Sequence, residues 1–394
     1  MPVLPPIRTI TLGIAEPHPI TAPVIERAKT ILQHTRVRYS EAGYEVQSVR
    51  LSTQPIFTNL AGWSIGSILA YTKELQSLLD AAGLQYCSLG PAQVTNPGFP
   101  LDQLKLIVDL LARTRVFSAT VQMATLEHGL RQDAAMPTAH IIQRLAQETP
   151  SGDGNFRFAM LACVAPGCPF FPAAYHTGPE SLSIGLQGAS IVREALLGHE
   201  AEMTIGLDMR SVTQWVSDSL NERAAPIVAL GQQLTQEHSL LFRGIDLSPT
   251  PMGDDSIVPP LELCAGGPLG TPGTLAAVAA VTAALRSTTL PTCGYCGLML
   301  PVLEDAMLGQ RWEEDYVNVH QLLFYSSVCG TGLDTIPLAG SHSVGEIAHL
   351  LLDVATLSLR LQKPLSARLF PVIGRQTGER TTFTSPYLTN TRIK

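Results

Sequence analysis

Short apolar or β-branched segments alternate with amphipathic segments from one end of the chain to the other. Residues 8–14 (RTITLGI) are typical of a buried strand, and the stretch after Pro23 carries apolar residues at helical spacing. A strand followed by a helix, repeated many times, is the pattern of α/β proteins with a mainly parallel sheet. No serine/glycine run or charged block interrupts the pattern, so residues 1–394 are expected to form one domain.

The alternation predicts roughly ten strands, which is more than an eight-stranded barrel can use. Gly83 ends the helix predicted before it, because glycine readily closes a helix in the left-handed conformation. Residues 317–328 fit a helix or a strand. Strands are predicted at 8–14, 44–51, 84–89, 116–122, 156–164, 182–186, 240–247, 296–302 and 367–373, and helices at 64–82, 101–113, 138–147, 212–236, 274–285 and 343–362.

The composition limits the functional classes. Apolar residues make up 45% of the chain and charged residues only 15%, so a large core can form and disorder is excluded as the main state. A net charge of −7 argues against a broad surface for nucleic acid or anionic membranes. The cysteine count of 7 is odd, and the longest apolar stretch, 275–285, is too short to cross a bilayer. We therefore expect a cytoplasmic protein with free thiols, and apolar outer helices favour a homodimer.

The loop at 164–176 (VAPGCPFFPAAYH) is the first candidate for a binding site. Proline and glycine restrict its backbone, two phenylalanines supply an apolar wall, and Tyr175 and His176 supply polar groups. His176 could act as a general base or hold a metal. It could equally be a packed histidine that bonds a backbone carbonyl.

Carboxylates after predicted strands are the second candidate group. Clustered carboxylate oxygens are the ligands that Mg²⁺ and Ca²⁺ prefer. Asp246 could also take part in acid/base chemistry, and Ser248 could bind the substrate. The alternative is that such carboxylates cap helices. The candidate metal ligands are Asp246, Asp254, Glu304 and Asp305.

The segment YSSVCGTGLDT is the third candidate. Cys329 could act as a nucleophile or an acid if a cationic group such as His176 lies beside it, and Asp334 could orient that histidine. Alternatively, Cys329 is a small buried residue that serves only in packing. A substrate could be bound by the neighbouring residues Gly330, Thr331 and Thr335.

These segments also carry a family resemblance. The stretches NFRFAMLACVAPGCPFFPAAYH, GIDLSPTP, CGLMLPVLED and YSSVCGTGLDTIPLAG resemble the domain-of-unknown-function 711 family, also called uncharacterised protein family 0210. The family's fold is similar to pyruvate formate-lyase and anaerobic ribonucleotide reductase. The resemblance implies a ten-stranded α/β barrel of two parallel five-stranded halves. The C-terminal segment FPVIGRQTGERTTF has no RVxGY-like motif, so no glycyl radical is expected.

The leading functional hypothesis is an enzyme that acts on a small polar or anionic metabolite. Its chemistry would be acid/base or thiol-assisted, as in a lyase, isomerase or hydrolase, with His176, Cys329, Asp334 and Asp246 as the candidate catalytic residues. The alternative is a non-catalytic metabolite sensor. A third hypothesis is redox chemistry at Cys293 and Cys296, which form a CxxC motif.

Overall fold

The computed structural model describes residues 4–203 and 208–394. Its strands form one mixed sheet in the order β8-β7-β1-β2-β3-β4-β6-β10-β9, and β5 pairs with β4. The strands are β1 (Ile7–Gly13), β2 (Val49–Ser52), β3 (Cys87–Ala92), β4 (Phe117–Thr125), β5 (Gly129–Leu130), β6 (Phe158–Ala162), β7 (Ser181–Leu186), β8 (Leu241–Asp246), β9 (Gly332–Ala339) and β10 (Leu365–Val372). The predicted α/β class is confirmed.

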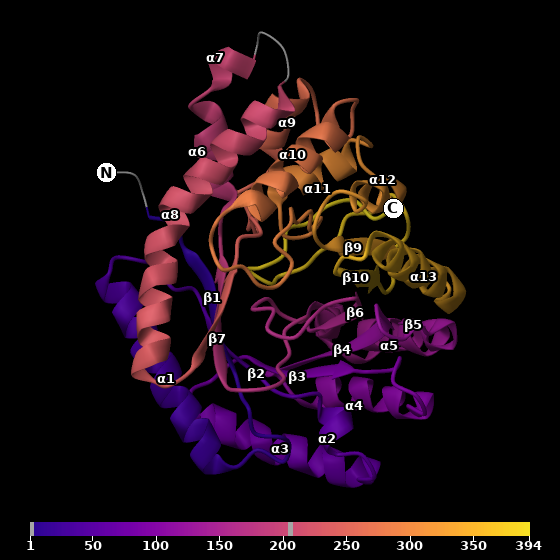
Figure 1. Cartoon of the computed structure of the whole chain (residues 1–394). Coiled ribbons are helices and arrows are strands. Elements are labelled where there is room, and N and C mark those ends of the chain that lie inside the picture. The colour runs from indigo at the N-terminus through magenta and orange to yellow at the C-terminus, as the bar shows by residue number, and fades with distance from the viewer. Residues whose placement is uncertain (1–3, 204–207) are drawn as a thin grey trace.

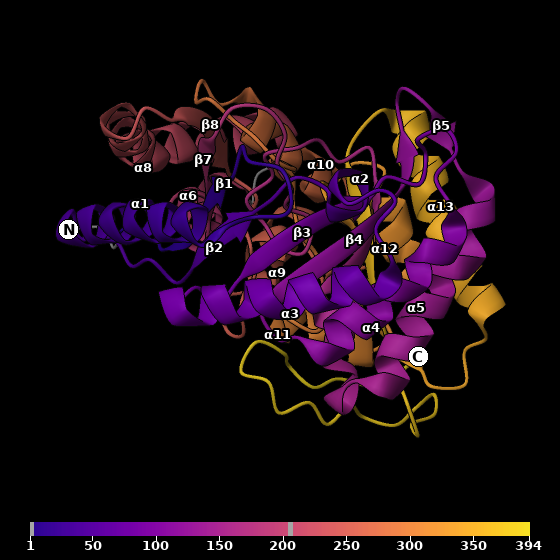
Figure 2. The same cartoon turned by 90° about the horizontal axis from the view of Figure 1, so that it is seen from below.

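Helices cover the outer side of these strands (Figures 1 and 2). They are α1 (Ala22–Glu41), α2 (Ile56–Asn59), α3 (Ile65–Ala82), α4 (Lys105–Arg113), α5 (Ala135–Glu148), α6 (Ala189–Leu197), α7 (Glu200–Met203), α8 (Met209–Glu237), α9 (Val258–Ala265), α10 (Thr274–Ser287), α11 (Ala306–Glu313), α12 (Val319–Tyr325) and α13 (Val344–Leu361). Short 3₁₀ helices occupy Leu101–Leu104, Gln132–Ala134 and Pro150–Phe156.

Local signals in the sequence explain where several helices begin and end. Ser64 accepts a hydrogen bond from the backbone N–H of Ser67 at the start of α3, and Gly83 ends that helix with φ +73°. Helix α13 begins with a reciprocal capping box between Ser343 and Glu346. The ambiguous segment 317–328 contains helix α12. None of the helices in the described residues is long and apolar enough to cross a membrane.

Strand directions divide the sheet into two groups. The first group consists of the parallel strands β1, β2, β3, β4 and β6. The second group runs in the opposite direction and consists of two parallel pairs, β7 with β8 and β9 with β10. The groups meet through antiparallel pairs, β1 with β7 and β6 with β10. β8 and β9 are the two ends of the strand order, so the sheet is not closed by a regular ladder.

The chain between β8 and β9 differs from the prediction. The strand expected at 296–302 is not regular, because Cys296 turns the backbone with φ +39°. Isolated parallel bridges join Thr292 to Ile245 of β8 and Pro301 to Asp334 of β9. β9 itself was not predicted, because glycine, aspartate and proline in GLDTIPLA are typical of a loop.

The link from β6 to β7 fills space beside the inner face of the sheet. We call its residues 163–176 the plug; Figure 1 shows it in magenta at the centre of the molecule. Side chains of several strands donate hydrogen bonds to its backbone carbonyls: Thr11 to Pro169, Ser88 to Ala174 and Gln122 to Val164. These bonds hold the plug in one place and satisfy its buried carbonyl groups.

Candidate functional site

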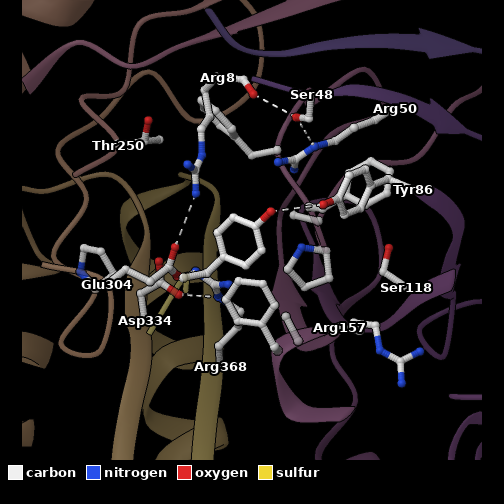
Figure 3. Close-up of a pocket in the computed structure, with 18 of the residues that line it drawn as sticks. Arg8, Ser48, Arg50, Tyr86, Ser118, Arg157, Thr250, Glu304, Asp334 and Arg368 are labelled. Atoms are coloured by element: carbon white, nitrogen blue, oxygen red, sulfur yellow. Dashed lines mark hydrogen bonds and ion pairs between the residues drawn. The ribbon is translucent and has the colours of Figure 1, made fainter. Parts of the chain in front are cut away.

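A cavity of about 330 Å³ lies at the tip of the plug (Figure 3). We call it the chamber. Strands from both groups contribute to its wall, and the plug contributes Phe170, Phe171, Pro172 and Ala173. The polar side chains that line it include Arg8, Arg50, Tyr86, Ser118, Tyr295, Glu304, Thr331, Asp334 and Arg368.

One wall of the chamber holds two carboxylates and two arginines. Arg368 of β10 donates from Nε to Asp334 and from Nη2 to Glu304. Arg8 of β1 lies farther away, with 3.8 Å between its Nη2 and a carboxylate oxygen of Glu304. Burial would lower the pKa of Arg368, but the two carboxylates outweigh it and raise that pKa. The charges on this wall are therefore paired.

The pKa of Glu304 is shifted from its ordinary value. Burial raises its pKa, with Arg368 opposing this effect and the neighbouring Asp334 adding to it. A buried carboxyl with a raised pKa beside a second carboxylate can hold and release a proton nearer to neutral pH than an ordinary glutamate does.

Arg50 of β2 lies on the opposite wall, as Figure 3 shows. Its Nε donates to the hydroxyl of Ser48 at 3.0 Å, and its guanidinium lies 5.4 Å from the ring centre of Tyr86 and 5.1 Å from that of Phe171. No carboxylate in the described residues forms an ion pair with it. Burial, and then the charge of Arg8, lowers its pKa to about 10, so Arg50 stays charged at neutral pH.

Three buried hydroxyl groups face the chamber without partners. Among the described residues, the hydroxyls of Ser118, Tyr295 and Thr331 have no hydrogen-bond partner, although each residue is at most 5% exposed. An unsatisfied buried polar group costs about 1–3 kcal/mol, so such groups are rare and usually have a purpose. Together with the unpaired Arg50 they form a polar surface suited to a ligand.

Some of the sequence-predicted residues lie at the chamber and others do not. Glu304, Thr331 and Asp334 line it. Tyr175 is buried and donates its hydroxyl to the carbonyl of Val164 inside the plug. The ring of His176 packs against Gly13, where a Cβ would lie 2.1 Å from Nδ1, so only glycine fits there.

His176 and Cys329 are held by separate groups of residues, and neither lines the chamber. Nε2 of His176 lies 3.1 Å from the carbonyl oxygen of Gly178, and burial lowers the pKa of this imidazole. The carbonyl of Cys329 accepts a hydrogen bond from the buried ammonium of Lys363. No cysteine of the described residues lines the chamber.

The loops around Gly330 pack tightly against other backbone. A Cβ on Gly330 would lie 2.3 Å from Cα of Gly297, so glycine permits contact between two chain segments here rather than with a ligand. Thr335 accepts a hydrogen bond from the backbone N–H of Leu303. Ser248 donates to Asp246 and accepts from the N–H of Gly297.

The four candidate metal ligands are in different places. Asp246 accepts hydrogen bonds from the N–H groups of Ser248, Tyr295 and Cys296, so it ties the 293–296 turn to the end of β8. Burial raises its pKa, and these bonds partly offset that effect. In residues 4–203 and 208–394 no three His, Cys, Asp or Glu side chains are grouped as a metal site.

The other two carboxylates of this set are also outside the chamber. Asp305 caps helix α11 by accepting from the N–H of Leu308, and it accepts a second bond from Ile257. Asp254 is exposed. Of the adjacent pair Glu304 and Asp305, one residue therefore faces the chamber and the other is a helix cap.

The sequence interpretation missed the arginines. Arg8, Arg50 and Arg368 are single charges within or beside otherwise apolar strand segments, in a chain that has only 15% charged residues. A charged residue at the inward position of a predicted strand is unusual unless it is paired or functional. That signal was present in RTITLGI, VRLS and SARLF.

A buried histidine supports the end of the plug at His176, and its burial predicts an effect of pH on stability. Nδ1 of His18 lies 2.7 Å from the hydroxyl of Tyr71, and Nε2 lies 2.9 Å from that of Thr53, whose carbonyl accepts from the N–H of His176. Burial lowers the pKa of His18 to about 4. Between that value and the ordinary 6.5 the unfolded chain binds more protons, so stability falls as pH falls through this window.

Because of His18, we expect the free energy of unfolding to fall by about 2 kcal/mol between pH 7 and pH 5. Urea unfolding at both pH values should show that loss in the wild type and a smaller one in His18→Gln. His140→Gln is the matched control, because His140 is exposed. Equal pH dependence in wild type and His18→Gln would contradict the assignment.

The chain is an α/β protein in which a mixed sheet and an inserted plug line a chamber with arginine and aromatic side chains. It belongs to the family described as "Uncharacterised ACR (DUF711)", whose sequence profile matches residues 4–385. A UPF0210 protein of Actinobacillus pleuropneumoniae is 25% identical over 403 residues, covering 96% of this chain and 87% of the relative.

Other relatives have the same extent of similarity. A UPF0210 protein of Clostridium perfringens is 25% identical over 400 residues, and one of Pelotomaculum thermopropionicum is 26% identical over 398 residues. Each alignment covers 95% of this chain and 87% of the relative. The family resemblance expected from the sequence motifs is confirmed.

Proposed function

We propose that the protein is an enzyme that acts on a small anionic metabolite in the chamber by acid/base chemistry. The observation that carries the proposal is Arg50, a half-buried guanidinium that faces a cavity and has no carboxylate partner in the described residues. An unpaired buried charge is costly, and a bound anion would supply the missing partner.

The two walls of the chamber suit two different tasks. Arg50 would bind the anionic group, because the two terminal nitrogens of a guanidinium can donate to both oxygens of a carboxylate. Glu304 and Asp334, on the other wall, would move the proton, and Arg368 would position them. The unpartnered hydroxyls of Ser118, Tyr295 and Thr331 would bind the remaining polar atoms.

Closure of the sheet into a barrel is part of the same proposal. Residues 291–302 would act as the tenth strand of a ring of two five-stranded halves, with β5 outside it. The isolated bridges to β8 and β9 and the hydrogen bond from Gly330 N–H to the Leu298 carbonyl support this arrangement. Such a ring would be similar to the pyruvate formate-lyase fold.

The test separates an enzyme from a sensor. A library of small anionic metabolites is screened by thermal shift, and each hit is assayed for turnover. We expect Glu304→Gln to bind the hit within a few-fold of wild type and to lose at least 100-fold in kcat, because removal of a proton-transferring group costs about that much. Glu262→Gln is the matched control, since Glu262 pairs with Arg311 outside the chamber.

Binding without turnover for every hit would contradict the enzyme and favour a sensor. Undiminished kcat in Glu304→Gln would remove that residue from the chemistry. A hit whose affinity does not change in an Arg50 variant would show that the anion binds elsewhere.

A further inference from the structure

We infer that the ligand of the chamber is an aromatic carboxylate, with its single negative charge on Arg50 and its ring against a band of aromatic side chains. This inference rests on the proposed function and adds the chemical class of the substrate. It is carried by the charge balance of the chamber and by the continuity of the aromatic band.

The charge balance indicates one negative charge. Arg368 bonds both Glu304 and Asp334, and Arg8 lies at ion-pair distance from Glu304. Two cations thus face two carboxylates on that wall. Arg115 also lines the chamber but pairs with Asp80, so the lining charges that remain are Arg50, Arg157 and Glu45, with an excess of one positive charge. The guanidinium of Arg157 donates to three backbone carbonyls, whereas Arg50 has no carboxylate partner in the described part of the chain and is the group that an anion would neutralise. A carboxylate would neutralise it, whereas a dianionic phosphate would add a second charge near Glu304 and Asp334.

Aromatic side chains link Arg50 to Arg368 through ring contacts and one contact between hydroxyl groups. Arg50 lies over the rings of Phe171 and Tyr86, and the hydroxyl of Tyr86 is 3.5 Å from that of Tyr387. The ring of Tyr387 stacks on that of Phe156 with 6.2 Å between centroids and an angle of 13°.

The guanidinium of Arg368 lies 5.4 Å from the ring centre of Phe156 and completes the series. Aromatic residues are only 6% of the chain, so their concentration around one cavity is specific to it. We call Phe171, Tyr86, Tyr387 and Phe156 the aromatic band. A planar ring packs against such faces better than an aliphatic chain, by offset stacking or edge-to-face contact.

The volume is consistent with this class of ligand. The chamber holds about 330 Å³. An apolar cavity of about 150 Å³ in an engineered protein binds benzene, so one ring with a carboxylate and further substituents fits here. Tyr387 lies on the C-terminal coil, which runs along the lower edge of the molecule in Figure 2. The residue is 41% exposed. The coil therefore supplies one solvent-exposed side of the chamber.

The test is isothermal titration calorimetry of the full chain at pH 7.5 with benzoate, cyclohexanecarboxylate, acetate and phenyl phosphate. We expect benzoate to bind at least tenfold more tightly than acetate, since it buries a ring that acetate lacks. We expect it to bind at least threefold more tightly than cyclohexanecarboxylate, which has similar bulk without a planar face. Phenyl phosphate should bind more weakly than benzoate.

Variants of the aromatic band give a second readout. Phe171→Leu and Tyr387→Leu should each reduce the preference for benzoate over cyclohexanecarboxylate to less than twofold. Phe324→Leu is the matched control, because Phe324 is 56% exposed and does not line the chamber. A preference that survives both band variants would overturn the role of the band.

The outcomes also separate this inference from the proposed function. If acetate and cyclohexanecarboxylate bind as tightly as benzoate and all three require Arg50, the aromatic class is wrong while anion binding stands. Tighter binding of phenyl phosphate than of benzoate would contradict the inference that the ligand carries a single negative charge. If none of the four anions binds below 10 mM, both the inference and the anion site are wrong.

Discussion

Arg50→Met is expected to make the empty protein more stable while it abolishes anion binding. The guanidinium is half-buried at the chamber wall, and in the described residues its polar and ring contacts are the Ser48 hydroxyl and two aromatic rings. Methionine has a similar length and no charge, so the substitution removes a desolvation cost without leaving a charged partner unpaired. We expect a gain of about 1–2 kcal/mol in the free energy of unfolding.

The same variant should lose at least 100-fold in affinity for an anion of the chamber. Each hydrogen bond to a charged group contributes about 1.5–3 kcal/mol, and two such bonds to one carboxylate correspond to that factor or more. Urea unfolding and calorimetric titration with benzoate measure the two effects. Arg36→Met on the exposed surface of α1 is the control and should change neither. A clear loss of stability in Arg50→Met would mean that Arg50 is a structural residue.

Arg368→Met is expected to have the opposite effect on stability, with a loss of about 3–5 kcal/mol at pH 7. Arg368 bonds two buried carboxylates at once. Its removal leaves Glu304 with the more distant Arg8, and leaves Asp334 without an ion-pair partner among the described residues. Breaking a buried pair by removing one partner is costly, because the other charge stays buried. The contrast between Arg50 and Arg368 therefore depends on their partners and not on their burial.

The pH dependence and a compensating variant test this explanation. Burial raises the pKa of Glu304, and without Arg368 the main opposing charge is gone, so the penalty is present at neutral pH and declines as pH falls toward about 4. The deficit of Arg368→Met relative to wild type should shrink between pH 7 and pH 5. Adding Glu304→Gln and Asp334→Asn should recover most of the lost stability at pH 7. A deficit that is constant with pH and not recovered would point to lost packing against Phe156 instead.

The alternation of strands and helices was readable from the sequence because each segment carries its own periodicity. β1, α3, α13 and β10 lie within a few residues of their predicted positions, and α3 ends at Gly83 as the sequence indicated. Segment 296–302 was wrong because its strand-like composition does not reveal the turn at Cys296. β9 was missed because its glycine and proline are tolerated only where neighbouring strands hold them in place.

The chamber was only partly predictable, since it depends on which strand faces meet. Glu304 and Asp334 stood out because carboxylates next to apolar segments are conspicuous. Arg8, Arg50 and Arg368 each carried the signal of a charge in an apolar segment, but only the sheet order brings the three together. Of the aromatic band only Phe171 had a local signal, in the loop of the plug, because the other members come from distant segments of the chain.

The separation of the chamber residues along the chain has a consequence for synthesis in the cell. Arg8 emerges from the ribosome early, and Arg368 follows 360 positions later. At about 5–20 residues per second the interval is roughly 20–70 s. During that time β6 lacks its neighbour β10 and Arg8 lacks Glu304, so the nascent chain exposes an open strand edge beside an unpaired arginine.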